Sequence, residues 1–453
     1  MGARLDNEAC KHRHLWAKLV CATRIENWSK GCFGDKLDTD SNMSTSRLLS
    51  LVLFLCLTAI ALRAAEIDSQ WRGPNRDGKY PGEKLLKQWP DAGPRLLWDV
   101  EGLGAGHGTV AVTDKNIFVT GMPDDNGILY AFDLSGKEIW RTEYGKEWTG
   151  DYPGTRCTPT VLGELLYLES GQGKVVCLDS NSGKIRWSVD LLERFSAENI
   201  PWGMTESLLI DGENVIATPG GPQHTLVALN RFDGQVVWTS KASGEPAAYC
   251  SPILANHNNT RLIITMTAES IIAVDADDGT FYWQTPQHQG NKIHANTPLY
   301  FDGKVVCASS SAQSHSGLVL LQLSDDGKSV SVLWRNQRFR NLMGGVILLD
   351  GYLYGSQYNS SRWSCIDVQS GDFAHRSSGF GGGVIVYADG LFYCYSEDGE
   401  LALVNATPRS FDIVSSFEIT KGTGQHWAHP VIKAGRLYLR HGDALMVHDI
   451  ARE

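Results

Sequence analysis

Aromatic and basic residues gather around a short pattern, Thr or Ser followed by Pro, that recurs along the chain. Clear copies are Thr158-Pro159, Ser251-Pro252, Thr297-Pro298 and, with His in place of Thr or Ser, His429-Pro430; looser copies stand at 205–207, 344–346 and 382–384. The residues in or near these copies that could bind a ligand are His107, Trp148, Tyr152, Arg156, Trp202, Glu206, Tyr249, His294, Arg340, Asn341, His426 and Trp427. Aromatic rings with a few polar groups are the usual composition of a small-molecule site. Arg156 and Arg340 would suit a carboxylate or a phosphate.

The alternative is that these residues only decorate a polar surface, and a single histidine such as His107 or His294 is more often structural than catalytic. The sequence contains no catalytic-triad, zincin, phosphate-loop or EF-hand motif. The acidic stretch Asp124-Asp125-Asn126-Gly127 lacks the spaced ligands of a calcium loop and predicts a turn. We therefore expect a binding site without a metal, and the sequence assigns no catalytic residue.

The elements that would position these residues form a repeat. An apolar strand, an Asp or Asn, a turn ending in Gly, two apolar residues and a Trp recur at 130–140, 175–187, 226–238 and 271–283, with a stretched copy at 318–334. Their tryptophans are spaced 45 to 51 residues apart. Two weaker copies at 363–375 and 401–417 carry Phe near the Trp position. A period of this length is typical of propellers and solenoids.

Three glycine-containing turns in each period divide it into four short strands. The first turn is Asp-Gly at 211–212, 302–303, 350–351 and 389–390, which is a strong hairpin signal. The final half-copy at 444–450 lacks a following strand, and the segment 94–100 with Trp98 lacks a preceding half-copy. Joining the two ends gives an eighth unit. The sequence thus predicts an all-β, eight-bladed β-propeller of four-stranded antiparallel blades, its ring closed by an N-terminal strand.

The repeated residues have structural explanations that we prefer to functional ones. A Trp on the last strand of each unit is placed to pack between neighbouring blades, where a buried ring removes about 150–250 Å² from water. The Asp or Asn before each third turn is expected to form the turn through bonds from its side chain to the backbone.

The module resembles the pyrroloquinoline-quinone (PQQ) repeat, found in quinoprotein dehydrogenases and in non-enzymatic relatives, one of which belongs to the bacterial outer-membrane assembly machine. The opening segment 69–78, SQWRGPNRDG, is similar to the start of exported repeat proteins of planctomycete-type bacteria. The family's dehydrogenases often stack the quinone on a disulfide between adjacent cysteines, and no Cys-Cys pair occurs here. Their calcium ligands and base have no matched positions that we can identify.

The N-terminal region reads as a targeting segment. Residues Leu48 to Leu62 form an apolar run behind Arg47, and small residues follow it at 64–65. This pattern is typical of a secretory signal and is short for a transmembrane helix. We expect 1–42 to be an upstream extension from a mis-assigned start codon, 43–65 a signal peptide and 66–453 a single propeller domain. The mature protein would be periplasmic or extracellular.

Charge and cysteine content restrict the partners. The formal net charge is −10 and no basic run marks the propeller region, so we expect no nucleic-acid partner. Six cysteines lie in the propeller region, at 157, 177, 250, 307, 365 and 394. An even number in an exported protein is compatible with disulfides, but their positions within strands favour unpaired burial. We expect a monomer with no membrane span after the signal is removed.

Three functions fit these observations. The first is a secreted binding or scaffold propeller of the cell envelope that holds a protein, peptide or glycan at its channel mouth, with no cofactor. The alternative is a PQQ- and calcium-dependent dehydrogenase of alcohols or sugars. A second alternative is a polysaccharide hydrolase or lyase, although no carboxylate pair stands out. The identity of the ligand does not follow from the sequence.

Overall fold

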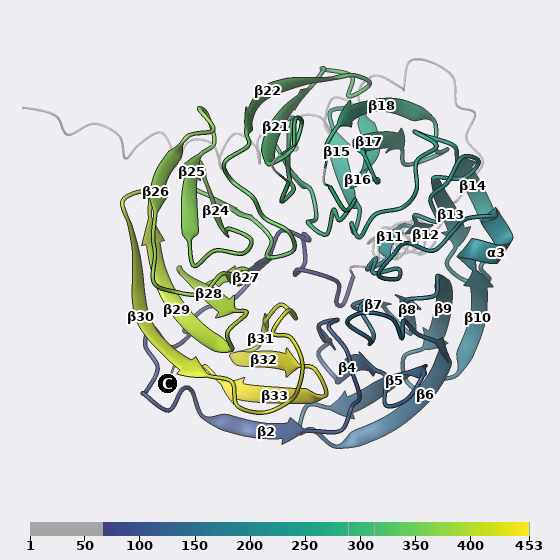
Figure 1. Cartoon of the computed structure of the whole chain (residues 1–453). Coiled ribbons are helices and arrows are strands. Elements are labelled where there is room, and N and C mark those ends of the chain that lie inside the picture. The colour runs from purple at the N-terminus through teal and green to yellow at the C-terminus, as the bar shows by residue number, and fades with distance from the viewer. Residues whose placement is uncertain (1–66, 289, 312, 453) are drawn as a thin grey trace, which may run out of the picture. The chain divides into compact units, whose positions relative to one another are not determined.

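The computed structural model describes residues 67–452 except 289 and 312, so the predictions for 1–42 and 43–65 lie outside the described residues. Eight sheets stand around a central channel; in seven of them the strands run in chain order from the channel to the rim, and in the eighth the rim strand comes from the N-terminal part of the described chain (Figure 1). The predicted eight-bladed, all-β propeller is confirmed. The described residues include one short helix, α3 (Leu191–Phe195), and no helix among them is long and apolar enough to cross a membrane.

We number the blades 1 to 8 along the chain. Blade 1 consists of β3 (Ala111–Val112), β4 (Asn116–Gly121), β5 (Asn126–Asp133) and β6 (Glu138–Lys146), and blade 2 of β7 (Thr160–Leu162), β8 (Leu165–Glu169), β9 (Lys174–Asp179) and β10 (Ile185–Asp190). Blade 3 consists of β11 (Leu209–Asp211), β12 (Asn214–Ala217), β13 (Leu226–Asn230) and β14 (Val236–Ser240). Blade 4 consists of β15 (Ile253–His257), β16 (Thr260–Met266), β17 (Ser270–Asp275) and β18 (Phe281–Pro286). Blade 5 consists of β19 (Leu299–Phe301), β20 (Lys304–Ala308), β21 (Leu318–Leu323) and β22 (Val330–Asn336). Blade 6 consists of β23 (Ile347–Leu349), β24 (Tyr352–Ser356), β25 (Trp363–Asp367) and β26 (Phe373–Arg376). Blade 7 consists of β27 (Gly383–Ala388), β28 (Leu391–Ser396), β29 (Glu400–Thr407) and β30 (Ser410–Glu418).

Blade 8 joins the two ends of the described chain. Its inner strands are β31 (Val431–Lys433), β32 (Arg436–His441) and β33 (Ala444–Asp449), and its rim strand is β2 (Leu96–Val100). β2 pairs antiparallel with β33, with Leu96 opposite His448 and Trp98 opposite Val447. The predicted closure of the ring by an N-terminal strand is therefore confirmed.

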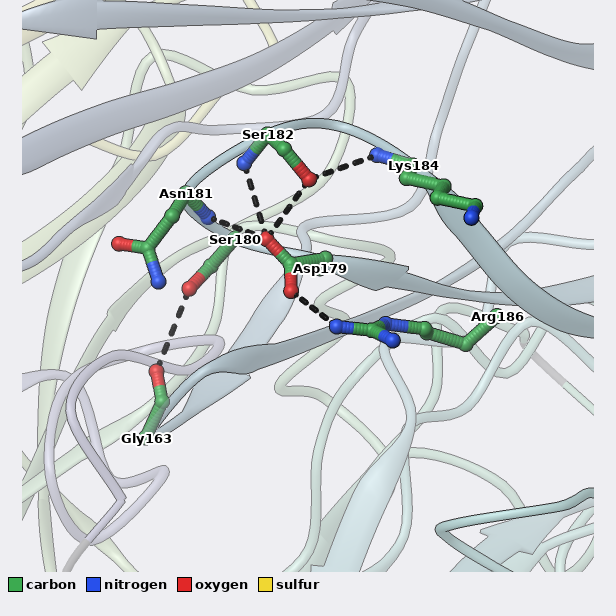
Figure 2. A network of polar contacts seen from close by, with 7 residues as sticks. All are labelled: Gly163, Asp179, Ser180, Asn181, Ser182, Lys184 and Arg186. Carbon is green, nitrogen blue, oxygen red and sulfur yellow. Dashed lines mark hydrogen bonds and ion pairs between the residues drawn. The ribbon is translucent and has the colours of Figure 1, made fainter.

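The acidic residue before each third turn bonds to the turn backbone, as Figure 2 shows for Asp179. Its carboxylate accepts from the backbone N–H of Asn181 at 3.2 Å and of Ser182 at 2.9 Å, and it pairs with Arg186. The bond to Arg186 and the bonds from Ser182 lower the pKa of Asp179 to about 2. Asp275 and Asp367 make the same first bond, to the N–H two residues on, at 2.7 Å. The turn-forming role is confirmed.

The repeat tryptophans seal the rim between blades. Trp238 of β14 donates its indole N–H to the Ala276 carbonyl of the next blade, at 3.2 Å. Its ring covers Gly279, where an added Cβ would lie 2.6 Å from it. The same indole-to-carbonyl bond joins the next blade at Trp187, Trp283, Trp334 and, across the closure, Trp98. At Trp98, Trp187, Trp238 and Trp334 the facing turn residue is a glycine with positive φ, and an added side chain there would collide with the ring.

The first described residues cross the channel. We call 67–80 the plug, and it is the purple segment that runs through the centre of the ring in Figure 1. Ser69 forms a bridge with Val161 on β7, and β1 (Lys79–Tyr80) pairs parallel with β27 on another side of the channel. The motif that resembled the start of other repeat proteins is thus the part of this chain that spans the ring interior.

Apolar residues of adjacent blades form a series of interblade cores rather than one central core. All six cysteines of the propeller domain are buried and unpaired. Cys157 and Cys250, for example, hold equivalent places beside inner strands, each 2 % exposed. Their role in this structure is packing.

Candidate functional site

One mouth of the channel opens into a cavity of about 510 Å³. Its wall is built by the residues that precede or follow the inner strands, and its floor by the plug. The lining residues are Trp71, His107, Tyr152, Arg156, Trp202, Thr205, Ser207, Tyr249, Ser251, Asn291, Ile293, Ala295, Leu342, Met343, Tyr358, Asn359, Glu397, Trp427 and His429. The volume lies within the range usual for small-molecule sites.

Several predicted site residues meet in this cavity: His107, Tyr152, Arg156, Trp202, Tyr249 and Trp427. The Trp427 ring lies between two of them, with centroids 5.0 Å from His107 and 5.0 Å from Tyr152. The Trp202 and Tyr249 rings are 6.3 Å apart. The expectation that these segments converge on the mouth agrees with this geometry, while ligand binding by them stays a prediction.

Glu206 and His294 are placed elsewhere because successive side chains of an extended chain point to opposite sides. Thr205 and Ser207 line the cavity, whereas Glu206 between them is buried and accepts from the Thr218 N–H of its own blade at 3.0 Å. His294 is likewise 1 % exposed between two lining neighbours. Placing either side chain in the mouth was wrong by one residue.

The remaining predicted residues also lie outside the lining. Trp148 packs its ring near Gly203 and donates its indole N–H to the Asp151 carbonyl at 3.0 Å. Arg340 is exposed to solvent. Asn341 is buried and bonds backbone carbonyls, and His426 stacks on His441 with ring centroids 3.6 Å apart. These residues support or surround the mouth without lining it.

Four aromatic or ionisable lining residues were missed from the sequence: Trp71, Tyr358, Glu397 and His429. His429 stood in a recognised inner-strand copy and could have been included by the same rule. Trp71 stands outside the repeat, so no alignment of blades could place it. Tyr358 and Glu397 follow second strands, where no pattern had been sought.

The charged groups of the cavity are few. Arg156 donates to the Asp151 carbonyl at 3.4 Å and to that of Tyr152, and burial lowers its pKa. Burial and the nearby guanidiniums of Arg156 and Arg440 lower the pKa of His107 to about 3, so this ring is neutral at pH 7. Loss of water raises the pKa of Glu397, opposed by the adjacent Trp427 indole. The cavity thus presents one permanent cation and one carboxyl group amid aromatic rings.

The floor is closed by the plug. The Trp71 indole N–H donates to the Thr297 hydroxyl at 2.8 Å, and its ring meets His429 edge-on at 4.8 Å. Arg72 follows, 2 % exposed, and donates to the Val346 carbonyl at 3.0 Å. Its guanidinium fills the space above Gly345, where any Cβ would collide with it. The second glycine at this inner-strand copy is therefore explained by an arginine from outside the repeat, whereas an added Cβ at Gly344 would lie 2.3 Å from the Gly383 carbonyl oxygen.

A second buried arginine of the plug, Arg76, donates to the carbonyls of Ser207 and Leu208. Beyond it lies another cavity of about 440 Å³, which includes Gln70, Asn75 and Tyr300 in its lining. The plug therefore divides the channel, and the aromatic cavity at the mouth is a blind pocket rather than a passage.

These features define the chain as an eight-bladed propeller whose sealed channel carries an aromatic pocket at one mouth. It belongs to the PQQ-repeat family whose model is described as "Outer membrane protein assembly factor BamB", which matches residues 88–172 and 125–377. Membership of the planctomycete-type group stays a prediction. The chain is 23 % identical over 291 residues to a Yersinia pestis protein named outer membrane protein assembly factor BamB, covering 60 % of this chain and 68 % of that one.

An enzyme is also among the relatives. The quinoprotein alcohol dehydrogenase PedH of Pseudomonas putida is 23 % identical over 176 residues, which span 38 % of this chain and 28 % of the enzyme. Among solved structures, BamB from Moraxella catarrhalis has a TM-score of 0.58 at 17 % identity, covering 79 % of this chain and 98 % of that one. A europium-containing methanol dehydrogenase has a TM-score of 0.60 at 11 % identity, with 85 % and 92 % covered. At these identities the likeness shows the fold alone.

Proposed function

We propose that this chain is an exported binding propeller of the cell envelope, periplasmic or extracellular, that holds a ligand or partner segment in the pocket at its channel mouth. The observation that carries this proposal is the pocket itself: about 510 Å³, closed below by Trp71 and walled by aromatic rings, with Arg156 as its one cation. Relatives named as assembly factors of the outer membrane support a place in the envelope. We expect the protein to act as a monomer without a cofactor.

A blocking variant tests the pocket. Ala295 lines the cavity, so Ala295→Trp should fill it, whereas Ala374→Trp places the same side chain on the exposed rim strand β26. Native mass spectrometry of protein purified from its own host should find a bound mass on the unaltered chain and on Ala374→Trp, and none on Ala295→Trp. A bound mass that survives in Ala295→Trp would place the ligand elsewhere.

A PQQ-dependent dehydrogenase is the alternative that the family raises. The pocket has flat rings for a planar quinone, but PQQ carries several carboxylates and Arg156 is the one cation in the lining. Catalysis would also require carboxylate ligands for calcium and a separate base. Among the described lining residues Glu397 is the one carboxylate, and it cannot fill both roles. The residues do not fit the group, so we expect no dye reduction after addition of PQQ, calcium and an alcohol.

Glu397, as the one carboxylate of the described lining, also argues against the polysaccharide-hydrolase alternative. Most glycoside hydrolases use two carboxyl groups on either side of the scissile bond. Glu206, the acid expected beside the mouth, is buried away from the pocket, and Glu397 has no second carboxylate beside it in the described lining. Turnover of an alcohol or a polysaccharide that disappears in Glu397→Gln, but not in Glu206→Gln, would establish an enzyme and overturn the binding proposal.

A further inference from the structure

The chemistry of the pocket narrows the class of ligand, an inference that rests on the proposed function. The backbone next to the inner strands, at the base of its wall, is already hydrogen-bonded along one arc. The Thr109 N–H donates to the Thr158 hydroxyl at 3.2 Å, the Thr158 N–H to that of Ser207 at 2.9 Å, and the Ser207 N–H to that of Ser251 at 3.0 Å. A peptide that binds as an added strand needs free backbone groups at a strand edge. This arc uses them between blades, so recognition falls to the side chains.

The side chains offer flat rings first. Trp427 is partly exposed, and its ring centroid lies 5.0 Å from those of Tyr152 and His107, both at tilted angles. Trp71 closes the floor and Trp202 stands on another part of the wall. A flat aromatic ring is suited to a flat, C–H-bearing surface such as one face of a pyranose, because it excludes water there and leaves the hydroxyl rim of the sugar accessible to polar groups.

Both charged groups of the lining lie near Trp427. Arg156 is bonded to the backbone of Tyr152, whose ring touches Trp427. The Glu397 carboxyl lies beside the Trp427 indole N–H. Arg156 forms no ion pair with a carboxylate of the described chain. Its Nη2 donates to the backbone carbonyls of Asp151 and Tyr152, which leaves Nη1 to donate to a ligand anion. A charge-assisted bond of this kind is stronger than a bond between neutral groups.

We propose that the pocket binds an acidic sugar, a pyranose that carries a carboxylate, stacked on Trp427 with its carboxylate on Arg156 and a hydroxyl donating to Glu397. A neutral sugar would leave Arg156 without its anion. A planar polyanion would bring more negative charge than one guanidinium balances. A single hexuronate unit matches the one cation, the one carboxyl acceptor and the aromatic ring near both of them.

Isothermal titration with trigalacturonate and with its neutral methyl ester tests the proposal, because the ester keeps the three sugar rings and removes their negative charge. We expect the acid to bind at least about tenfold more tightly than the ester, a difference of about 1.4 kcal/mol. Arg156→Gln should abolish that difference, Trp427→Ala should lower the affinity for both probes by at least tenfold, and the exposed Arg409→Gln should change nothing. Melting temperatures within 2 °C of the unaltered protein verify the fold, and Arg156→Lys, which keeps the charge, should retain part of the preference.

The outcomes separate the two proposals. Equal binding of acid and ester, or an acid preference that survives Arg156→Gln, would overturn the acidic sugar. If an acetylated tripeptide, acetyl-Glu-Tyr-Glu, bound with dependence on Arg156 while trigalacturonate did not, the pocket would stand as a binding site and the sugar would be wrong. If neither probe bound and host-purified protein carried no mass that Ala295→Trp removes, the proposed function would fall with it.

Discussion

At the rim of the ring neighbouring blades meet through a tryptophan and a turn, whereas at the channel they meet through the plug. The rim contact is made the same way again and again, as Trp238 with Gly279 and Trp334 with Gly371 illustrate. The channel contact is made once, by a segment whose Arg72 and Arg76 reach carbonyls of different inner strands. Repeated positions thus solve a repeated packing problem, and the centre of the ring, where all blades differ, requires residues from outside the repeat.

We expect the largest loss of stability from deleting residues 67–100, because this segment contributes to both the channel contact and the rim contact. The deletion removes both the plug and β2, leaving buried carbonyls unpaired at the channel and an open edge on β33. We expect the loss to exceed the whole stability of such a domain, about 5–15 kcal/mol, so that no soluble monomer forms. Size-exclusion chromatography with light scattering measures this, with a chain that begins at Glu66 as the control. A monomer with an unchanged melting temperature would show that neither segment seals the ring.

Gly279→Ala probes the rim alone. Gly279 has a φ of 75°, and its new Cβ would lie 2.6 Å from the Trp238 ring. Left-handed strain of about 1–2 kcal/mol adds to an overpacking cost of about 1–3 kcal/mol. Gly212→Ala is the matched control, because Gly212 has a φ of 59° with nothing within 4 Å of the added atom. Equal destabilisation of the two variants in denaturant titration would mean that the tryptophan contact contributes nothing.

The variant Glu206→Gln tests how a buried carboxyl group near the channel makes the stability of the fold depend on pH. Burial, opposed by bonds from Thr218 and by Arg76, raises the pKa of Glu206 to about 8, and burial also raises that of its neighbour Glu169. Between about pH 4.3 and 8 the folded chain keeps the Glu206 proton, whereas the unfolded chain releases it. The contribution of protonated Glu206 to the free energy of unfolding is therefore complete below about pH 4.3 and is lost as the pH rises, by up to about 1.4 kcal/mol per pH unit. Unfolding of Glu206→Gln at pH 5, 7 and 8 should show a shallower decline than that of the exposed Glu213→Gln. An identical slope for both variants would contradict the assignment.

The smallest expected effect is the loss of one indole hydrogen bond at the rim, which two Trp→Phe variants can separate from the loss of ring area. Trp334→Phe loses a ring edge and the 2.9 Å bond to the Val368 carbonyl. Trp140→Phe loses the same edge, but the Trp140 N–H has no partner among the described residues. We expect Trp334→Phe to be the more destabilising by about 1 kcal/mol, the usual net value of one such bond. Should Trp140→Phe prove equally costly or worse, the bond would not stabilise the rim.

The same contrast explains what could be predicted from the sequence. The blades, their turns and the closing strand β2 follow from spacing, because each repeat places the same residue types on the same strand. The pocket wall followed in part, since Arg156 and Trp427 precede aligned inner strands. Glu206 and His294 were misplaced because a shift of one residue reverses the side of an extended chain. Trp71, Arg72 and Arg76 could not be placed, because their partners lie far away in sequence and belong to no shared pattern.

The pairing of β2 with β33 has a consequence for how the protein is made. Leu96 reaches its partner His448 only after roughly 350 further residues have been synthesised. At about 5–20 residues per second, that interval lasts roughly 20 to 70 s. During it β2 has no partner, although the Trp140 blade and those after it can fold locally as they emerge. Ring closure is therefore the last long-range step. We expect it to limit the folding rate, because the chain loses the entropy of bringing distant strands together before their pairing contributes any stabilising energy.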